Sequence, residues 1–280
     1  MVKILMNIVL GALFLFVFLF LWVRLQERSG LFFPARDLYM SPAAEGLAFE
    51  DVHFSSAGNE LHGWYIPASG SQVVLWMHGN AGNIADRLDQ AVEMKRALGV
   101  SSFMFDYRGY GKSEGRPSEK GLYQDAAAAF KWLTETRGIK PGHIILYGHS
   151  LGSGASVDLA LDEGVHAGGM VLESPFTSAA DVASRMYLGL PVGLIMSVKL
   201  DNIGRIGEVK MPILIIHGAR DAVIAFSMGK KLFDAAPQPK TFLPIAGADH
   251  SDCYYVAPEE YWGAWKALLE DAGRRTQNAE

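Results

Sequence analysis

The pattern of hydrophobic and polar positions begins with a long apolar stretch. Residues 4–23 contain no charged side chain. A helix rising about 1.5 Å per residue would cross the ~30 Å hydrocarbon core over this length. The stretch is longer than the apolar region of a secretory signal, and no Ala-x-Ala-like cleavage site follows it. It therefore predicts one N-terminal transmembrane helix and a single-pass membrane protein. Lys3 on one side and Arg24, Arg28 and Arg36 on the other leave the orientation open.

After this stretch, short apolar runs alternate with amphipathic ones. Residues 47–55 and 61–66 predict a hairpin turned at Gly58-Asn59. Later apolar runs predict buried strands at 73–77, 103–105, 144–147, 170–172, 212–216 and 241–245. Helical patterns cover 84–98, 121–137, 151–163, 225–235 and 255–272. This alternation predicts an α/β domain over 47–273, with a mostly parallel sheet and right-handed crossovers. Residues 24–46 form a juxtamembrane segment before it, and 274–280 a flexible tail after it.

Two segments lie outside the alternation. Residues 31–34 (Leu-Phe-Phe-Pro) either lie in the membrane interface or dock on the domain. Residues 176–207 interrupt the strand–helix alternation and predict a short cap insertion. Their apolar run at 186–196 suggests that Phe176, Leu190 and Leu194 line an acyl pocket facing the bilayer. The alternative is a cap helix that simply packs on the core.

A Gly-x-Ser-x-Gly motif follows the strand at 144–147 directly. Residues 148–152 read Gly-His-Ser-Leu-Gly, and a helical pattern begins after them. A serine between a strand and a helix sits on a sharp turn that projects its hydroxyl clear of the sheet. Ser150 is therefore the predicted nucleophile. The N–H of Leu151, at the start of the helix, is a predicted donor to an oxyanion.

A serine nucleophile on such a turn needs an acid and then a histidine later in the chain. Asp221 follows the strand at 212–216, and His250 follows the strand at 241–245. Both lie past the carboxyl ends of strands, where ligands bind in open α/β sheets. We predict Asp221 as the acid and His250 as the base. Glu173, after the strand at 170–172, is the alternative acid, whereas Asp249 is too close to His250 in sequence to reach its imidazole.

The remaining oxyanion donor should come from the loop after the strand at 73–77. Residues 78–83 read His-Gly-Asn-Ala-Gly-Asn, and their glycines permit a tight loop. The backbone N–H of Asn80 is the predicted donor, with Ala81 as the alternative register. Asn83 is also placed to cap the helix that begins at Ile84.

Four segments together resemble an α/β-hydrolase, and more narrowly the membrane-anchored abhydrolase-domain serine hydrolases. These segments are 78–83, 106–113 (Asp-Tyr-Arg-Gly-Tyr-Gly-Lys-Ser), 148–152 and 217–221 (His-Gly-Ala-Arg-Asp). The resemblance implies the α/β-hydrolase fold over 47–273: a mostly parallel eight-stranded sheet with helices on both faces. It also implies a triad of Ser150, Asp221 and His250, and hydrolysis of esters or thioesters.

Other chemistries find little support in the sequence. Gly111-Lys112-Ser113 lacks the upstream glycine of a phosphate-binding loop, because position 106 is Asp. Asp106 and Arg108 are instead expected to brace neighbouring loops. A net charge of −5 gives no basic surface for nucleic acid. The histidines lack clustered ligand spacing and the single cysteine, Cys253, reads as a buried apolar side chain, so we predict no metal and no cofactor.

The sequence thus predicts a membrane-anchored serine hydrolase that cleaves esters or thioesters with apolar acyl groups. Its partners would be a small or lipid-like acyl ester and the membrane, through the N-terminal helix. Two other functions stay open. One is a serine peptidase on the same fold, because a triad does not distinguish amides from esters. The other is a catalytically silent, membrane-tethered scaffold.

Overall fold

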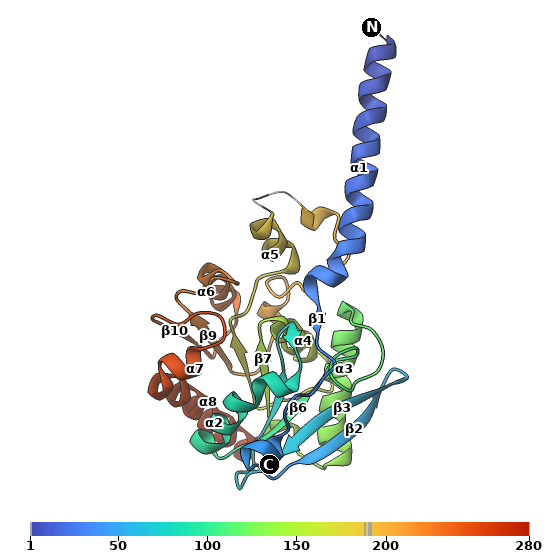
Figure 1. Ribbon diagram of the computed structural model, residues 1–280. Coiled ribbons are helices and arrows are strands. Elements are labelled where there is room, and N and C mark those ends of the chain that lie inside the picture. The colour runs from blue at the N-terminus through green and yellow to red at the C-terminus, as the bar shows by residue number, and fades with distance from the viewer. Residues whose placement is uncertain (1, 188, 190–191, 280) are drawn as a thin grey trace.

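A long helix projects from an α/β domain in the computed structural model, which describes residues 2–187, 189 and 192–279 (Figure 1). Helix α1 spans Val2–Leu31, and an apolar window within Val2–Arg24 has a mean hydropathy of 2.8 with none of it buried. The helix is long and apolar enough to cross a membrane. It continues beyond residue 23, because Arg24, Leu25, Gln26, Glu27 and Arg28 all favour helix.

The domain is built on an eight-stranded sheet with the order β10-β9-β8-β7-β4-β6-β3-β2. The hairpin strands β2 and β3 and the β3–β6 pair are antiparallel, and the other neighbours are parallel. The mostly parallel eight-stranded sheet is therefore confirmed. The strands are β2 (Glu50–Ser56), β3 (Asn59–Ile66), β4 (Val73–Met77), β6 (Ser101–Phe105), β7 (Ile144–His149), β8 (Gly169–Glu173), β9 (Ile213–Gly218) and β10 (Lys240–Ile245).

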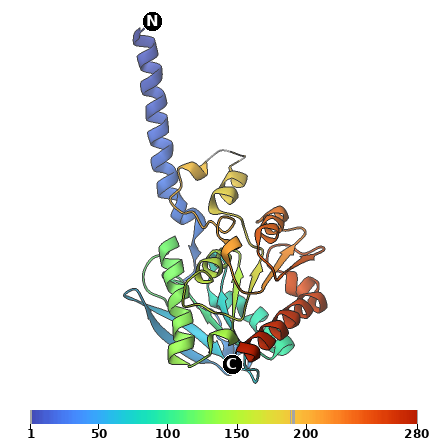
Figure 2. The same cartoon turned by 180° about the vertical axis from the view of Figure 1, so that it is seen from behind.

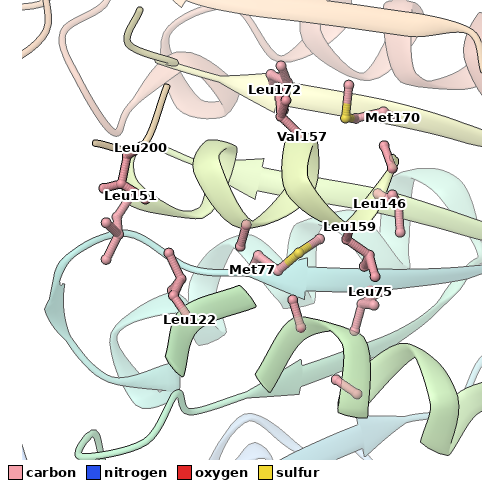
Figure 3. Close-up of a cluster of buried hydrophobic side chains, with 14 of the residues drawn as sticks. Leu75, Met77, Leu122, Leu146, Leu151, Val157, Leu159, Met170, Leu172 and Leu200 are labelled. Carbon is pink, nitrogen blue, oxygen red and sulfur yellow. The ribbon is translucent and has the colours of Figure 1, made fainter. Parts of the chain in front are cut away.

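Helices cover both faces of the sheet, as the views from opposite sides show (Figures 1 and 2). Alternate residues of β4 divide between two buried clusters: Leu75 and Met77 join one, and Val74 and Trp76 the other. The first cluster contains residues of α3, α4, α5 and α6, and the second contains residues of α2 and α8. Figure 3 shows part of the first cluster, with Leu122 of α3 and Leu151, Val157 and Leu159 of α4. The α-helices of the domain are α2 (Leu88–Leu98), α3 (Glu119–Lys131), α4 (Leu151–Leu159), α5 (Ala179–Met186), α6 (Phe226–Ala235), α7 (Cys253–Val256) and α8 (Pro258–Ala279).

The C-terminal helices differ from the sequence-based expectation. Instead of one helix over 255–272, α7 ends at Val256 and α8 begins at Pro258, a residue suited to the first turn of a helix. Helix α8 then runs to Ala279, so the segment expected as a flexible tail is helical. The Thr276 hydroxyl donates to the carbonyl of Gly142 at 3.0 Å, and Arg275 pairs with Asp271 one turn earlier. The bond to Gly142 attaches the end of the helix to the domain, and the pair with Asp271 supports its last turns from within the helix.

The segment after α1 docks on the domain. Phe32 is 5% exposed and belongs to the first buried cluster, and β1 (Phe33–Pro34) forms a small parallel sheet with β5 (Ala81–Gly82). Of the two placements open for residues 31–34, docking is the one observed. Short 3₁₀ helices complete the N-terminal half at Pro42–Glu45 and at Ile84–Arg87, where Asn83 forms a capping box with Asp86.

The insertion at 176–207 lies between β8 and β9 and beside the end of α1 (Figure 1). It contains α5 and a single turn at Val192–Leu194, and a further turn follows at Ile206–Glu208. Trp22 of α1 and Tyr187 at the end of α5 make an edge-on ring contact, with centroids 6.3 Å apart. The insertion therefore packs against the N-terminal helix as well as the core.

Candidate active site

Ser150 occupies a strained turn between β7 and α4. Its backbone φ of 50° and ψ of −113° lie in a region that non-glycine residues rarely adopt. The flanking glycines permit the turn, since a Cβ at Gly148 or Gly152 would collide with the backbone of Gly152 or Met77. The Ser150 N–H donates to the carbonyl of Glu173 at 2.9 Å, which fixes the turn against β8. This is the geometry expected of a nucleophile elbow.

Asp221 and His250 meet at the same edge of the sheet. Nδ1 of His250 donates to Oδ2 of Asp221 at 2.8 Å, and Oδ1 of Asp221 accepts the backbone N–H groups of Val223 and Ile224. Burial alone would raise the pKa of the Asp221 carboxyl. Hydrogen bonds from His217 and His250, together with the charge of His250, outweigh burial and hold that pKa well below its usual range. An ionised Asp221 keeps the proton of His250 on Nδ1 and leaves Nε2 to accept one.

His149, the neighbour of Ser150, connects the elbow to His250. Its Nε2 contacts the carbonyl of His250 at 3.0 Å, and the two imidazole rings lie 5.1 Å apart between centroids. The Ser174 hydroxyl donates to the same carbonyl at 2.9 Å. Burial, and then the charge of His250, lower the pKa of His149 to about 3, so its ring is neutral. These contacts hold the backbone of His250 against the residue that follows Gly148 in the elbow, His149, and against Ser174 after β8.

The two rival acids occupy other positions. The Glu173 carboxylate accepts from the hydroxyls of Tyr147 and Tyr261, both at 2.6 Å, and from the amide of Gln90 at 3.3 Å. Oδ1 of Asp249 accepts the backbone N–H groups of Ala222 and of His250 itself. Among the described residues, Asp221 is the carboxylate that contacts the imidazole of His250.

The loop at 78–83 lies against the elbow. A Cβ on Gly79 would lie 3.6 Å from the Cβ of Ser150, so the loop backbone passes beside the serine. Nδ1 of His78 contacts the carbonyl of Gly79 at 2.7 Å, and burial lowers the pKa of His78 to about 3. A neutral His78 can therefore donate to this carbonyl. The backbone N–H groups of Asn80 and Ala81 follow in the next two peptides, and that of Leu151 begins α4.

Comparisons with known proteins identify the family and the fold. Residues 68–204 match the family described as serine aminopeptidase, S33. The chain is 35% identical to alpha/beta hydrolase domain-containing protein 17B of Xenopus laevis, over 71% of this chain and 67% of that protein. It is 34% identical to the alpha/beta hydrolase domain-containing protein WAV2 of Arabidopsis thaliana, over 82% of each. The chain belongs to the α/β-hydrolase superfamily. A Pyrococcus furiosus esterase shares the fold, with a TM-score of 0.71 and 19% identity over 86% of this chain and 97% of that one.

The insertion of this α/β-hydrolase places the predicted pocket residues differently. Phe176 is 5% exposed within the first buried cluster, Leu194 is 85% exposed, and Leu190 lies outside the described residues. Leu194 therefore lines no closed pocket. An apolar crevice of about 70 Å³ lies instead between α1 and α5. It is lined by Trp22, Val23, Gly30, Leu31, Val182, Ala183, Met186, Tyr187, Val192 and Met196.

One side chain that contacts Asp221 was not found from the sequence. Nε2 of His217 lies 3.3 Å from Oδ2 of Asp221. His217 follows the apolar run at 213–216 directly, and its position just before the loop that carries Asp221 was the available signal. Asp106 braces a neighbouring loop as expected, because its Oδ1 accepts the backbone N–H of Ile84 at 3.0 Å. His78 and Asp106 are both fully buried, with 3.6 Å between Nε2 and Oδ1. Burial raises the pKa of Asp106 to about 8. Arg108 braces a loop as expected, with Nη2 at 2.7 Å from Oδ1 of Asp125.

Within the described residues, one group has ligand atoms close enough to hold a metal ion: Asp51, His53 and His62. These residues share one face of the β2–β3 hairpin, at the edge of the sheet opposite to β10. Oδ1 of Asp51 already accepts from His62 at 2.6 Å and from Trp64 at 3.1 Å. Lys112 lies 3.9 Å from the other oxygen of Asp51 and would repel a cation. Asp51, His62 and Trp64 thus form a hydrogen-bonded group within the hairpin.

Proposed function

We propose that this α/β-hydrolase is a membrane-anchored serine hydrolase that cleaves carboxylic esters or thioesters with apolar acyl groups. The observation that carries the proposal is a strained Ser150 whose neighbour His149 contacts a His250 that is hydrogen-bonded to an ionised Asp221. A serine on an elbow, a histidine and a buried carboxylate form the arrangement that activates a hydroxyl for attack on a carbonyl.

The reaction would proceed in two acyl-transfer steps. Nε2 of His250 takes the Ser150 proton as Oγ attacks the carbonyl carbon, and returns it to the departing alkoxide or thiolate. Asp221 stabilises the imidazolium that forms. His250 then removes a proton from water, which attacks the acyl-enzyme, and returns that proton to Oγ of Ser150 as the acid leaves. No group beyond these side chains is needed for the proton balance.

The negative charge that develops on the carbonyl oxygen needs donors aimed at it. We assign this role to the backbone N–H of Leu151 and that of Asn80, with Ala81 as the alternative to Asn80. The close approach of Gly79 to Ser150 supports a position beside the reacting carbon. One such donor contributes about 3–4 kcal/mol to transition-state stabilisation.

The N-terminal helix and the insertion support an apolar acyl group. The exposed apolar face of α1 would lie in the bilayer, and the crevice between α1 and α5 begins where the apolar stretch ends, at Trp22 and Val23. The first buried cluster is continuous from Val23 and Phe32 to Leu151 and Phe176 beside the elbow. The crevice therefore borders the same buried cluster as the elbow, which favours an apolar acyl group on this side of the domain.

A chain-length series tests the acyl assignment. Ala183 lines the crevice and is 7% exposed, so Ala183→Leu would partly fill it. We expect kcat/KM for long-chain p-nitrophenyl esters to fall at least about fivefold relative to the short-chain acetate ester, whose turnover reports the triad alone. Leu194→Ala, which alters an exposed position on the same insertion, is the matched control. An equal effect of Ala183→Leu on all chain lengths would contradict the acyl assignment.

A peptidase is the second candidate function, because the matching family model is described as a serine aminopeptidase. Matched ester and anilide substrates with the same acyl group separate the two. We expect the ester to be turned over much faster than the anilide. Comparable or faster release of the anilide would favour the peptidase.

A further inference from the structure

The segment between the apolar helix and the domain is hydrogen-bonded to the loop beside Ser150. We call residues 33–37 the strap. The Phe33 N–H donates to the carbonyl of Asn80, and the Ala35 N–H to that of Gly82, both at 3.0 Å. In return, the Ala35 carbonyl accepts from the Gly111 N–H at 2.9 Å. A segment that only linked α1 to the domain would not require backbone hydrogen bonds to the loop at 78–83.

Side chains reinforce the attachment on both sides. The Asn83 amide donates to the carbonyls of Asp37 at 2.8 Å and Ala35 at 3.3 Å. Nη1 of Arg36 donates to the carbonyl of Ser113 at 2.5 Å. The Tyr110 hydroxyl donates to the Asn80 carbonyl at 2.8 Å, beside the bond from Phe33. The strap is therefore held between the loop at 78–83 and the loop at 106–113.

The bonds to Asn80 fix a peptide plane next to the serine. A peptide is planar, so the carbonyl of Asn80 and the N–H of Ala81 turn together. Phe33 and Tyr110 both hold that carbonyl. The preceding plane, which carries the Asn80 N–H, is held at the Gly79 carbonyl by His78. Whichever N–H faces the oxyanion, the strap fixes the Cα of Asn80, at which the two planes meet.

We propose that the strap is a positioning element for the oxyanion loop, so that the membrane-proximal segment sets the rate of the chemical step. The inference rests on the proposed function. Donors contribute to catalysis only when they are fixed before the reaction, and a displacement of about 1 Å can cost a hundredfold in rate. Loosening the strap should thus lower kcat and leave substrate binding unchanged.

The test removes single donors from the Asn80 carbonyl in the full-length protein in detergent. Phe33→Pro deletes the N–H, whereas Phe33→Ala retains it and changes only a half-exposed side chain. Tyr110→Phe deletes the second donor. We expect Phe33→Pro to lower kcat for a p-nitrophenyl ester about 10- to 100-fold with KM within about twofold. Phe33→Ala should retain the wild-type rate, and Tyr110→Phe should fall between them.

Equal kcat values in Phe33→Pro and Phe33→Ala would overturn the proposal, as would parallel changes of kcat and KM. If Phe33→Pro fails to fold, Arg36→Ala, which removes the strap's bond to the Ser113 carbonyl, decides in the same way. Backbone hydrogen exchange at residues 79–83 is measured alongside and needs no substrate. Faster exchange in Phe33→Pro than in Phe33→Ala supports the strap, and equal exchange overturns it. A wild-type protein that hydrolyses nothing would count against the proposed function, while the exchange result would still decide on the strap.

Discussion

Replacing Asp221 by Asn removes a charge from the site while preserving the size of the side chain. In the structure Oδ2 accepts from His250 at 2.8 Å, and Oδ1 accepts the N–H groups of Val223 and Ile224 at 2.9 and 2.7 Å. Those two N–H groups require an oxygen, so the introduced amide would turn its NH2 group toward His250. Nδ1 of His250 would then have to accept, and its proton would move to Nε2.

That tautomer cannot take a proton from Ser150, so the substitution should act on the chemical step. The expected loss is about 10⁴ in kcat, which corresponds to about 5.5 kcal/mol at ~1.36 kcal/mol per tenfold change. Activity above the uncatalysed rate should remain, because the oxyanion donors and the substrate contacts are unchanged. The assay is the steady-state hydrolysis of a short p-nitrophenyl ester, with the thermal unfolding midpoint measured to confirm folding.

Glu173→Gln is the matched control for Asp221→Asn. It makes the same chemical change at the rival acid, whose carboxylate contacts Tyr147, Tyr261 and Gln90. We expect its kcat to stay within about fivefold of wild type, because the change removes no hydrogen bond to the imidazole. If Asp221→Asn retained most activity while Glu173→Gln abolished it, the reasoning would be refuted and Glu173 would be the acid.

Two further predictions concern two buried carboxyl groups, those of Asp106 and Asp125. Burial raises the pKa of Asp106 to about 8, whereas the pKa of an aspartate in an unfolded chain is about 4. The folded state therefore holds the proton more tightly than the unfolded state. The free energy of unfolding should fall as the pH rises between these two values. Asp106→Asn should therefore gain stability relative to wild type from pH 5 to pH 8 in urea unfolding, and a constant difference would contradict this. Asp125→Ala would leave the mostly buried guanidinium of Arg108 without its carboxylate and should cost about 3–5 kcal/mol of unfolding free energy. A cost below about 1 kcal/mol in urea unfolding would show that Arg108 finds another partner.

The strands and the order of the site residues could be predicted from the sequence because they depend on local patterns. A buried parallel strand is a short apolar run, and β4 occupies Val73–Met77 as expected. The elbow is also local, since a strained serine needs glycine on both sides. The pairing of Asp221 with His250 follows from strand order, which brings β9 and β10 together at one edge.

What the sequence did not reveal depends on contacts between distant segments. Strand β1 has two residues, one of them a proline, and no pattern shows that it pairs with Ala81–Gly82. The exposure of Leu194 depends on the single turn at Val192–Leu194. The apolar side chains of this turn, taken alone, suggested that it would be buried. The end of α8 was expected to be a flexible tail. It is attached to the domain by the contact of Thr276 with Gly142, and no local pattern indicates a contact between residues so far apart in the sequence. Tertiary contacts decided each of these positions.

Labelling with a fluorophosphonate tests the central claim most directly, because the probe forms a bond only with an activated serine. The experiment compares the full-length protein with Ser150→Ala, each in membranes and after denaturation. The account predicts strong labelling of the folded wild type, none in Ser150→Ala, and none after denaturation of either protein. Equal labelling of wild type and Ser150→Ala would place the reactive nucleophile elsewhere. No labelling of a folded wild type would contradict an activated Ser150 and favour the membrane-tethered scaffold.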